Sequence, residues 1–116
     1  MHELGVAIDI VDIAGDALAR MGPVHVTSVR VRVGPLSGVA KDALLFSFGA
    51  AAAGTPLENA RLEIEDVPVT AWCSVCDAER EPSDFAVRRC PVCQSAMPRL
   101  IRGDELEVVG LEVQDA

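Results

Sequence analysis

The chain has 116 residues, of which half are hydrophobic and 3% aromatic, and its formal net charge is −8 at pH 7. This length allows one modest aliphatic core and a small metal-stabilised segment. An acidic surface repels phosphate backbones, which argues against nucleic-acid binding, and no apolar run is long enough to cross a membrane. The first residues lack the basic region of a signal peptide, so we expect a cytoplasmic protein.

The first half of the chain predicts alternating helices and strands. Apolar residues at helical spacing predict a helix over residues 3–20. Valines that alternate with arginines predict a strand over 29–33, with a bulge or a strand start near Thr27-Ser28, where the apolar phase changes. A second helix is expected over about 41–53, and a second strand from Arg61.

The second half predicts a cysteine-rich segment over about 72–98, followed by a last strand over 106–113. The segment has little periodicity, as expected where a metal replaces a core. The fold class is therefore α+β: a small three-stranded sheet with two helices, plus an inserted zinc-ribbon-like knuckle with four cysteines. We expect residues 1–70 and 100–116 to form one discontinuous α+β domain, and residues 71–99 to form a zinc-binding domain.

Two C-x-x-C pairs, Cys73/Cys76 and Cys90/Cys93, contain all the cysteines of the chain. Each pair can supply two adjacent corners of the tetrahedron that thiolates form around Zn²⁺. The thirteen residues between the pairs lie just below the usual zinc-ribbon spacing. A closed four-thiolate site has no open coordination position, so this zinc is expected to hold structure. Disulfides or a redox dithiol are the alternatives.

Several local motifs occur in one order along the chain. They are Met1-His2-Glu3-Leu4, Gly34-Pro35-Leu36-Ser37-Gly38-Val39, Gly54-Thr55-Pro56-Leu57-Glu58, Leu62-Glu63-Ile64, Ala71-Trp72-Cys73, Cys90-Pro91-Val92-Cys93 and Gly103-Asp104-Glu105-Leu106. In this order they resemble the HypA/HybF family of hydrogenase nickel-incorporation proteins. The match is collinear over essentially the whole chain, which makes it more specific than the cysteines alone.

The resemblance implies a nickel metallochaperone and not an enzyme. It implies a nickel-binding α+β domain, a structural zinc domain, and Ni²⁺ as transient cargo for the large subunit of nickel–iron hydrogenase. The GTPase HypB is the implied partner, urease is a recipient in some organisms, and a homodimer is left open. By the motif match, the expected metal ligands are His2 for nickel, with Met1 and Glu3 in support, and Cys73, Cys76, Cys90 and Cys93 for zinc.

Five positions depart from the family pattern, one of which is Gly5 in place of a frequent Ser. Pro35 stands where members commonly carry Glu, and Ala40 stands where some carry an acidic residue near the nickel site. Asp77 and Gln94 follow the cysteine pairs where Gly is usual, so both must adopt a positive φ if the backbone is kept.

Without the resemblance, His2 is weak evidence for a nickel site, because a lone histidine near a terminus is usually a solvated side chain. Its position in the chain adds some support. An imidazole on residue 2 lies close to the α-amino group and to main-chain amide nitrogens, and planar nitrogen donors suit Ni²⁺ or Cu²⁺. The positive end of a helix that begins at residue 3 opposes a cation, and the Glu3 carboxylate offsets it. The competing hypothesis is a zinc-ribbon protein-interaction module without nickel delivery. Arg88 and Arg89 could steady the thiolates or contact a partner, although a solvated pair is the default.

Overall fold

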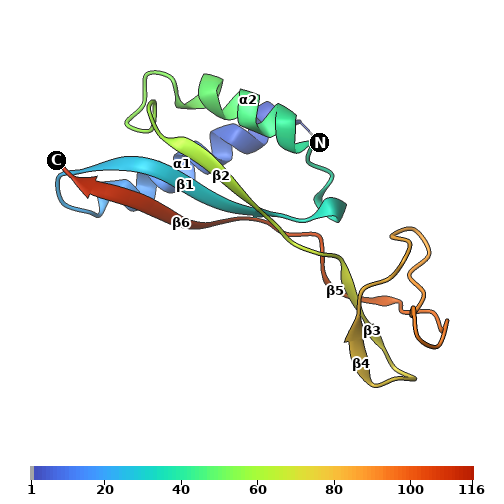
Figure 1. The fold of residues 1–116 in the computed structure, drawn as a ribbon. Coiled ribbons are helices and arrows are strands. Elements are labelled where there is room, and N and C mark those ends of the chain that lie inside the picture. The colour runs from blue at the N-terminus through green and yellow to red at the C-terminus, as the bar shows by residue number, and fades with distance from the viewer. Residues whose placement is uncertain (1) are drawn as a thin grey trace.

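A computed structural model describes residues 2–116 and contains two helices, one short 3₁₀ turn and two small sheets (Figure 1). In chain order the elements are α1 (Glu3–Ala19), β1 (Val24–Val33), η1 (Pro35–Ser37), α2 (Lys41–Ala52), β2 (Arg61–Asp66), β3 (Thr70–Cys73), β4 (Ala78–Arg80), β5 (Arg99–Arg102) and β6 (Leu106–Asp115). The first sheet has the strand order β2-β1-β6 and the second β4-β3-β5. The expected α+β class, with a four-cysteine segment inserted before the last strand, is confirmed.

Strand β1 is the centre of the first sheet. It pairs in parallel with β2, where Val31 lies opposite Ile64, and antiparallel with β6, where Val31 lies opposite Val108. The register shifts between Val26 and Ser28, so the phase change in the sequence is a bulge inside one continuous strand.

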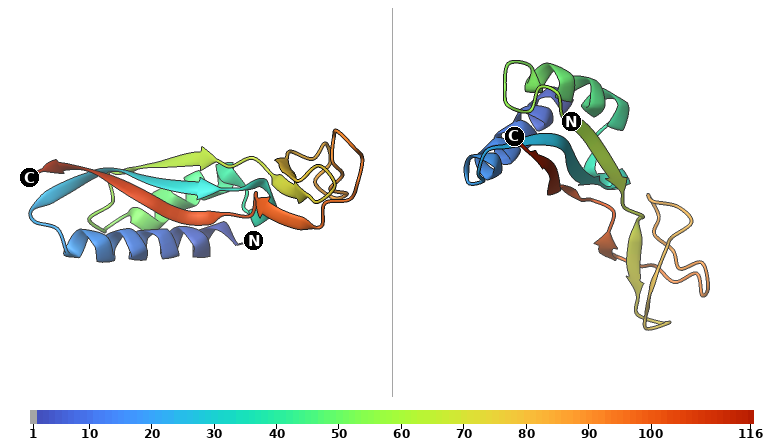
Figure 2. Two further views of the ribbon diagram at one scale, coloured as in Figure 1. Left: turned by 90° about the horizontal axis from the view of Figure 1, so that it is seen from below. Right: turned by 60° about the vertical axis from the view of Figure 1, so that its left-hand side comes forward.

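The helices α1 and α2 cover one face of the first sheet, and the other face is open (Figure 2). Alternation along β1 explains this arrangement, because Val29 and Val31 are buried under the helices while Arg30 and Arg32 are exposed. The helices contribute buried residues at helical spacing, namely Ala7, Ile10, Val11 and Ala14 from α1 and Leu44, Phe48 and Ala52 from α2. Within residues 2–116, neither helix combines the length and apolar character needed to span a membrane.

The second sheet was not expected from the sequence. Strands β3, β4 and β5 have only three or four residues each, which is too short for alternation to stand out. The sheet has a very small core of its own: the buried residues are Ala71, Cys73, Cys90 and Met97, with Cys76 and Cys93 packed against them.

The molecule is elongated because the second sheet lies beyond the end of the first, away from the helices (Figure 1). Its principal extents are 55 × 26 × 16 Å and its radius of gyration is 17.6 Å. A compact chain of this length would have a radius of gyration of about 13 Å. The second sheet therefore presents most of its surface to solvent and receives little support from the main core.

A close main-chain contact holds the connection between the two sheets. The amide of Gly34 donates to the carbonyl of Glu105 (2.8 Å), and the amide of Leu36 donates to the carbonyl of Gly103 (2.7 Å). A Cβ at Gly34 would overlap the carbonyl of Gly103 and approach the amide nitrogen of Asp104 to 2.8 Å. Glycine is required here because the segment before η1 packs directly against the connection between β5 and β6.

We expect Gly34→Ala to lower the free energy of unfolding by about 1–3 kcal/mol, the usual cost of overpacking a site that cannot relax. The control is Gly49→Ala, because Gly49 is exposed within α2 and a Cβ there meets nothing within 4 Å. That substitution should stabilise the protein by up to about 1 kcal/mol, because alanine is the better helix former. Chemical unfolding monitored by circular dichroism measures both changes, and an unchanged midpoint for Gly34→Ala would contradict the contact.

Candidate metal centres

The four cysteines converge at the far end of the second sheet. Cys73 ends β3, Cys76 lies in the turn before β4, and Cys90 and Cys93 lie on a second turn. The Sγ atoms of Cys73 and Cys93 are 3.5 Å apart, those of Cys76 and Cys90 are 3.8 Å apart, and all four lie within 4.8 Å of one another. In a zinc tetrathiolate with Zn–S bonds of about 2.3 Å, the sulfurs are about 3.8 Å apart. The cluster therefore fits a four-coordinate metal ion with little movement.

Main-chain amides point at the sulfurs within each turn. The amide of Cys76 donates to the Sγ of Cys73 (3.3 Å), and the amide of Val92 donates to the Sγ of Cys90 (3.4 Å). Such bonds favour the thiolate form that a metal requires. Asp77 and Gln94 have φ values of 54° and 65°. Both therefore adopt the left-handed backbone that was predicted because glycine is usual at these positions in the family. The left-handed conformation costs energy for a residue other than glycine. It occurs here because these residues close the two turns that orient the cysteine sulfurs.

The thiols of the cluster hold their protons unequally. The side chain and main chain of Ser95 hydrogen-bond to Cys93 and lower its pKa to about 6. The hydrogen bond with Cys93 raises the pKa of Cys76 to about 11.

The arginines beside Cys90 bind main-chain carbonyls. Arg88 donates to the carbonyls of Met97 (3.3 Å) and Pro98 (3.2 Å), and Arg89 donates to that of Gln94 (3.3 Å). These hydrogen bonds connect the segment before Cys90 to residues 94–98, which follow the Cys90/Cys93 turn. The thiols of Cys76 and Cys90 raise the pKa of a different arginine, Arg80, which belongs to no sequence motif and was therefore not predicted to be part of the site.

The expected nickel ligand His2 lies immediately before α1. It has an extended backbone (φ −86°, ψ 100°) and an exposed side chain, and its carbonyl accepts the first helical hydrogen bond from Val6 (3.2 Å). The other histidine, His25, is exposed near the start of β1, whereas Glu3, the neighbour of His2, contacts Ala40 beyond the end of β1. The structure therefore does not bring the two histidines together, and Met1 lies outside the described residues.

The carboxylate of Glu3 is already engaged by the main chain. Its Oε2 atom accepts a hydrogen bond from the amide of Ala40 (3.2 Å), the residue directly before α2. Ala40 has no side-chain cap of its own, so Glu3 supplies an anionic acceptor at the positive end of α2. The contact holds the first turn of α1, and with it His2, against the start of α2.

The Glu3–Ala40 contact predicts a specific pH dependence. The amide of Ala40 holds the pKa of Glu3 below its ordinary value of 4.5. Because the folded-state pKa is lowered, the stabilisation by Glu3 is complete above 4.5 and is lost as the pH falls through the lower folded value. In an NMR titration, the Ala40 amide shift should move with a midpoint below 4.5, and Glu3→Gln should remove that transition. A midpoint at or above 4.5 would contradict the contact.

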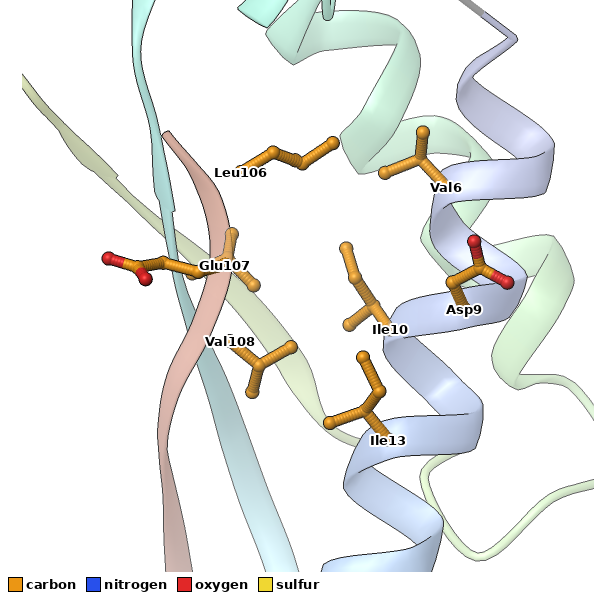
Figure 3. A pocket seen from close by; sticks show the side chains of 8 residues that line it. Val6, Asp9, Ile10, Ile13, Leu106, Glu107 and Val108 are labelled. Atoms are coloured by element: carbon orange, nitrogen blue, oxygen red, sulfur yellow. The ribbon is translucent and has the colours of Figure 1, made fainter. Parts of the chain in front are cut away.

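A cavity of about 200 Å³ lies between α1 and the edge strand β6 (Figure 3). Its walls are mainly aliphatic and come from Val6, Ile10, Ile13, Val31, Leu106 and Val108. The carboxylate of Glu107 points away from it. The cavity therefore presents apolar surface, and the residues expected to bind metal lie elsewhere.

The fold and the cysteine cluster together define a small α+β protein whose inserted second sheet gathers four potential metal ligands. Residues 1–113 match the family described as hydrogenase/urease nickel incorporation, metallochaperone, hypA. The chain is 49% identical to the hydrogenase maturation factor HypA of Roseiflexus sp. over 115 residues, which covers 99% of this chain and 94% of that protein. It is 48% identical to the protein of the same name from Chloroflexus aggregans, over 97% of this chain and 98% of that one. The chain belongs to the HypA family of nickel-incorporation metallochaperones.

Solved structures agree on the fold. The solution structure of the nickel metallochaperone HypA from Helicobacter pylori aligns with a TM-score of 0.66 over the whole of both chains, at 23% identity. A second solution structure of a HypA protein aligns with a TM-score of 0.63 at 20% identity. At these identities the likeness concerns the arrangement of helices and sheets.

Proposed function

We propose that this protein is a nickel metallochaperone and not an enzyme, and that it receives Ni²⁺ at its N-terminus through His2. Family membership over the whole chain carries the proposal. The exposed position of His2 beside a fixed first helical turn supports it, because a delivery protein needs accessible ligands that can be exchanged. Imidazole and main-chain nitrogens are donors that suit Ni²⁺.

Glu3 supports this site by position. Its Oε2 is occupied by the amide of Ala40, so we assign the carboxylate to hold the helix start and to offset the helix dipole near the cation. The methyl side chain of Ala40 offers no ligand atom. The remaining donors are therefore expected from Met1 and the main chain.

We propose Zn²⁺ as the resident metal of Cys73, Cys76, Cys90 and Cys93. The sulfur spacing supports a tetrahedral ion, and a site closed by four thiolates suits a structural role. When bound, zinc supplies the cross-link that replaces a hydrophobic core in the second sheet. We accordingly propose residues 71–99 as a zinc-binding domain, and residues 1–70 and 100–116 as the nickel-binding domain.

The proposed recipient is the large subunit of nickel–iron hydrogenase, with the GTPase HypB as the partner that docks the carrier, in the cytoplasm. Urease is a second recipient where that enzyme is present. Nickel passes by ligand exchange from His2 to the recipient's donors while the partners are in contact. We propose no role with nucleic acid or membranes.

A transfer experiment tests this function. Nickel-loaded protein is mixed with purified hydrogenase large-subunit precursor, the proteins are separated, and the nickel in each is measured, with His2→Ala and free Ni²⁺ as controls. The proposal predicts faster loading from the wild-type carrier than from free Ni²⁺ in the presence of a competing chelator. Equal loading from wild type, His2→Ala and free Ni²⁺ would favour the protein-interaction module.

A further inference from the structure

Arg80 occupies an unusual place for a charged side chain. It ends β4 and lies opposite Ala71 of β3, which is fully buried in the small core beside Cys73 and Cys90. The side chain of Arg80 is half-buried, and its Nε atom is buried with no hydrogen-bond partner among the residues described. A buried N–H without an acceptor is costly, so this position favours an anionic acceptor such as a neighbouring thiolate.

The side chain of Arg80 projects from the face of the second sheet that carries the cysteine cluster, because Arg80 lies opposite Ala71 and alternation along β3 puts Ala71 on the same face as Cys73. The side chains of Cys76 and Cys90 raise the pKa of Arg80. Neighbouring arginines have other partners: Arg88 donates to main-chain carbonyls, and Arg102 pairs with Glu79 (3.2 Å). Arg80 is therefore the cation placed against one cysteine from each C-x-x-C pair.

We infer that Arg80 is a positioning residue for the metal cluster, where it donates N–H groups to the thiolates of Cys76 and Cys90 and balances their charge. Four thiolates around a divalent cation leave two net negative charges, in a chain that is already strongly acidic. The guanidinium offers several donors in a fixed fork, which can reach two sulfurs at once. Such outer partners orient metal ligands and tune affinity. This inference rests on the proposed zinc site.

The test compares wild type with Arg80→Met, Arg80→Lys and the control Arg99→Met, which removes the same charge from an exposed position of β5 in the same sheet. Zinc affinity is measured by competition with a chromogenic chelator. We expect Arg80→Met to weaken zinc binding about 10–100-fold, the usual effect of losing an outer partner. Arg80→Lys should recover part of the affinity, because it restores the charge without the fork. Arg99→Met should stay within about twofold of wild type.

A spectroscopic readout separates this role from a general effect on folding. In cobalt-substituted protein, loss of an N–H donor raises the energy of the sulfur electrons, so the thiolate-to-cobalt charge-transfer band should move to longer wavelength in Arg80→Met and less so in Arg80→Lys. Wild-type affinity and band position in Arg80→Met would overturn the inference. If that variant fails to fold, the same result in Arg80→Lys overturns it. Absence of the band in wild-type protein would instead overturn the zinc site itself.

Discussion

His2→Ala is expected to abolish stoichiometric nickel binding while zinc content and the unfolding midpoint stay at wild-type values. The side chain of His2 is exposed and precedes α1, so its removal leaves no cavity and breaks no core contact. We expect nickel affinity to fall at least about 100-fold, since a direct ligand contributes more than the outer partners whose loss costs about 10–100-fold. Competition with a nickel-binding dye measures the change.

His25→Ala is the matched control for this experiment. His25 is the other histidine of the chain, is also exposed, and lies near the start of β1, whereas Glu3 contacts Ala40 beyond the end of that strand. Its removal should leave nickel affinity unchanged. If His25→Ala lost nickel binding and His2→Ala kept it, the cargo site would have to be moved to the other end of the first sheet.

Cys90→Ser is expected to unfold the second sheet and leave the first intact. The buried core of the second sheet consists of Ala71, Cys73, Cys90 and Met97, so two of its four residues are proposed zinc ligands. Structural zinc supplies about 10–16 kcal/mol of apparent binding free energy in zinc-finger peptides, and no apolar burial here can replace that amount. Amide NMR signals from residues 70–102 should collapse to disordered positions, while signals from β1 and α1 stay dispersed.

Ser74→Ala is the control for the cysteine substitution, because Ser74 is exposed within the same C-x-x-C turn. It should keep full zinc content and the wild-type fluorescence of Trp72, the single tryptophan, which lies beside Cys73 on β3.

Removal of zinc from the wild-type protein with a chelator should have the same effect as Cys90→Ser. Retention of dispersed signals for residues 70–102 after zinc removal would mean that the second sheet is stable by itself, which would contradict the proposed structural role of zinc.

The sequence predicted the helices and the first sheet closely because their periodicity is strong. The helix expected over 3–20 runs from Glu3 to Ala19, and that expected over 41–53 runs from Lys41 to Ala52. The phase change near Thr27-Ser28 predicted either a bulge or a strand start, and the structure contains the bulge. These features are local, so a single segment of chain contains the information that determines them.

Features that depend on contacts between distant residues were missed. Glu3 accepts a hydrogen bond from the amide of Ala40, 37 positions away in the sequence, and no pattern within either segment predicts this contact. The second sheet was not predicted because its strands are short. The role inferred for Arg80 was not predicted because it depends on where the fold places two sulfurs. The spacing of the two C-x-x-C pairs predicted the cysteine cluster, and the four Sγ atoms do lie within 4.8 Å of one another.

Calorimetric titration of Ni²⁺ into zinc-loaded protein with an authentic, untagged N-terminus tests the central claim most directly. The account predicts one equivalent of nickel bound at a site separate from zinc, with the zinc content unchanged at the end of the titration. Absence of nickel binding, or uptake only as zinc is displaced from the four cysteines, would contradict a cargo site at His2.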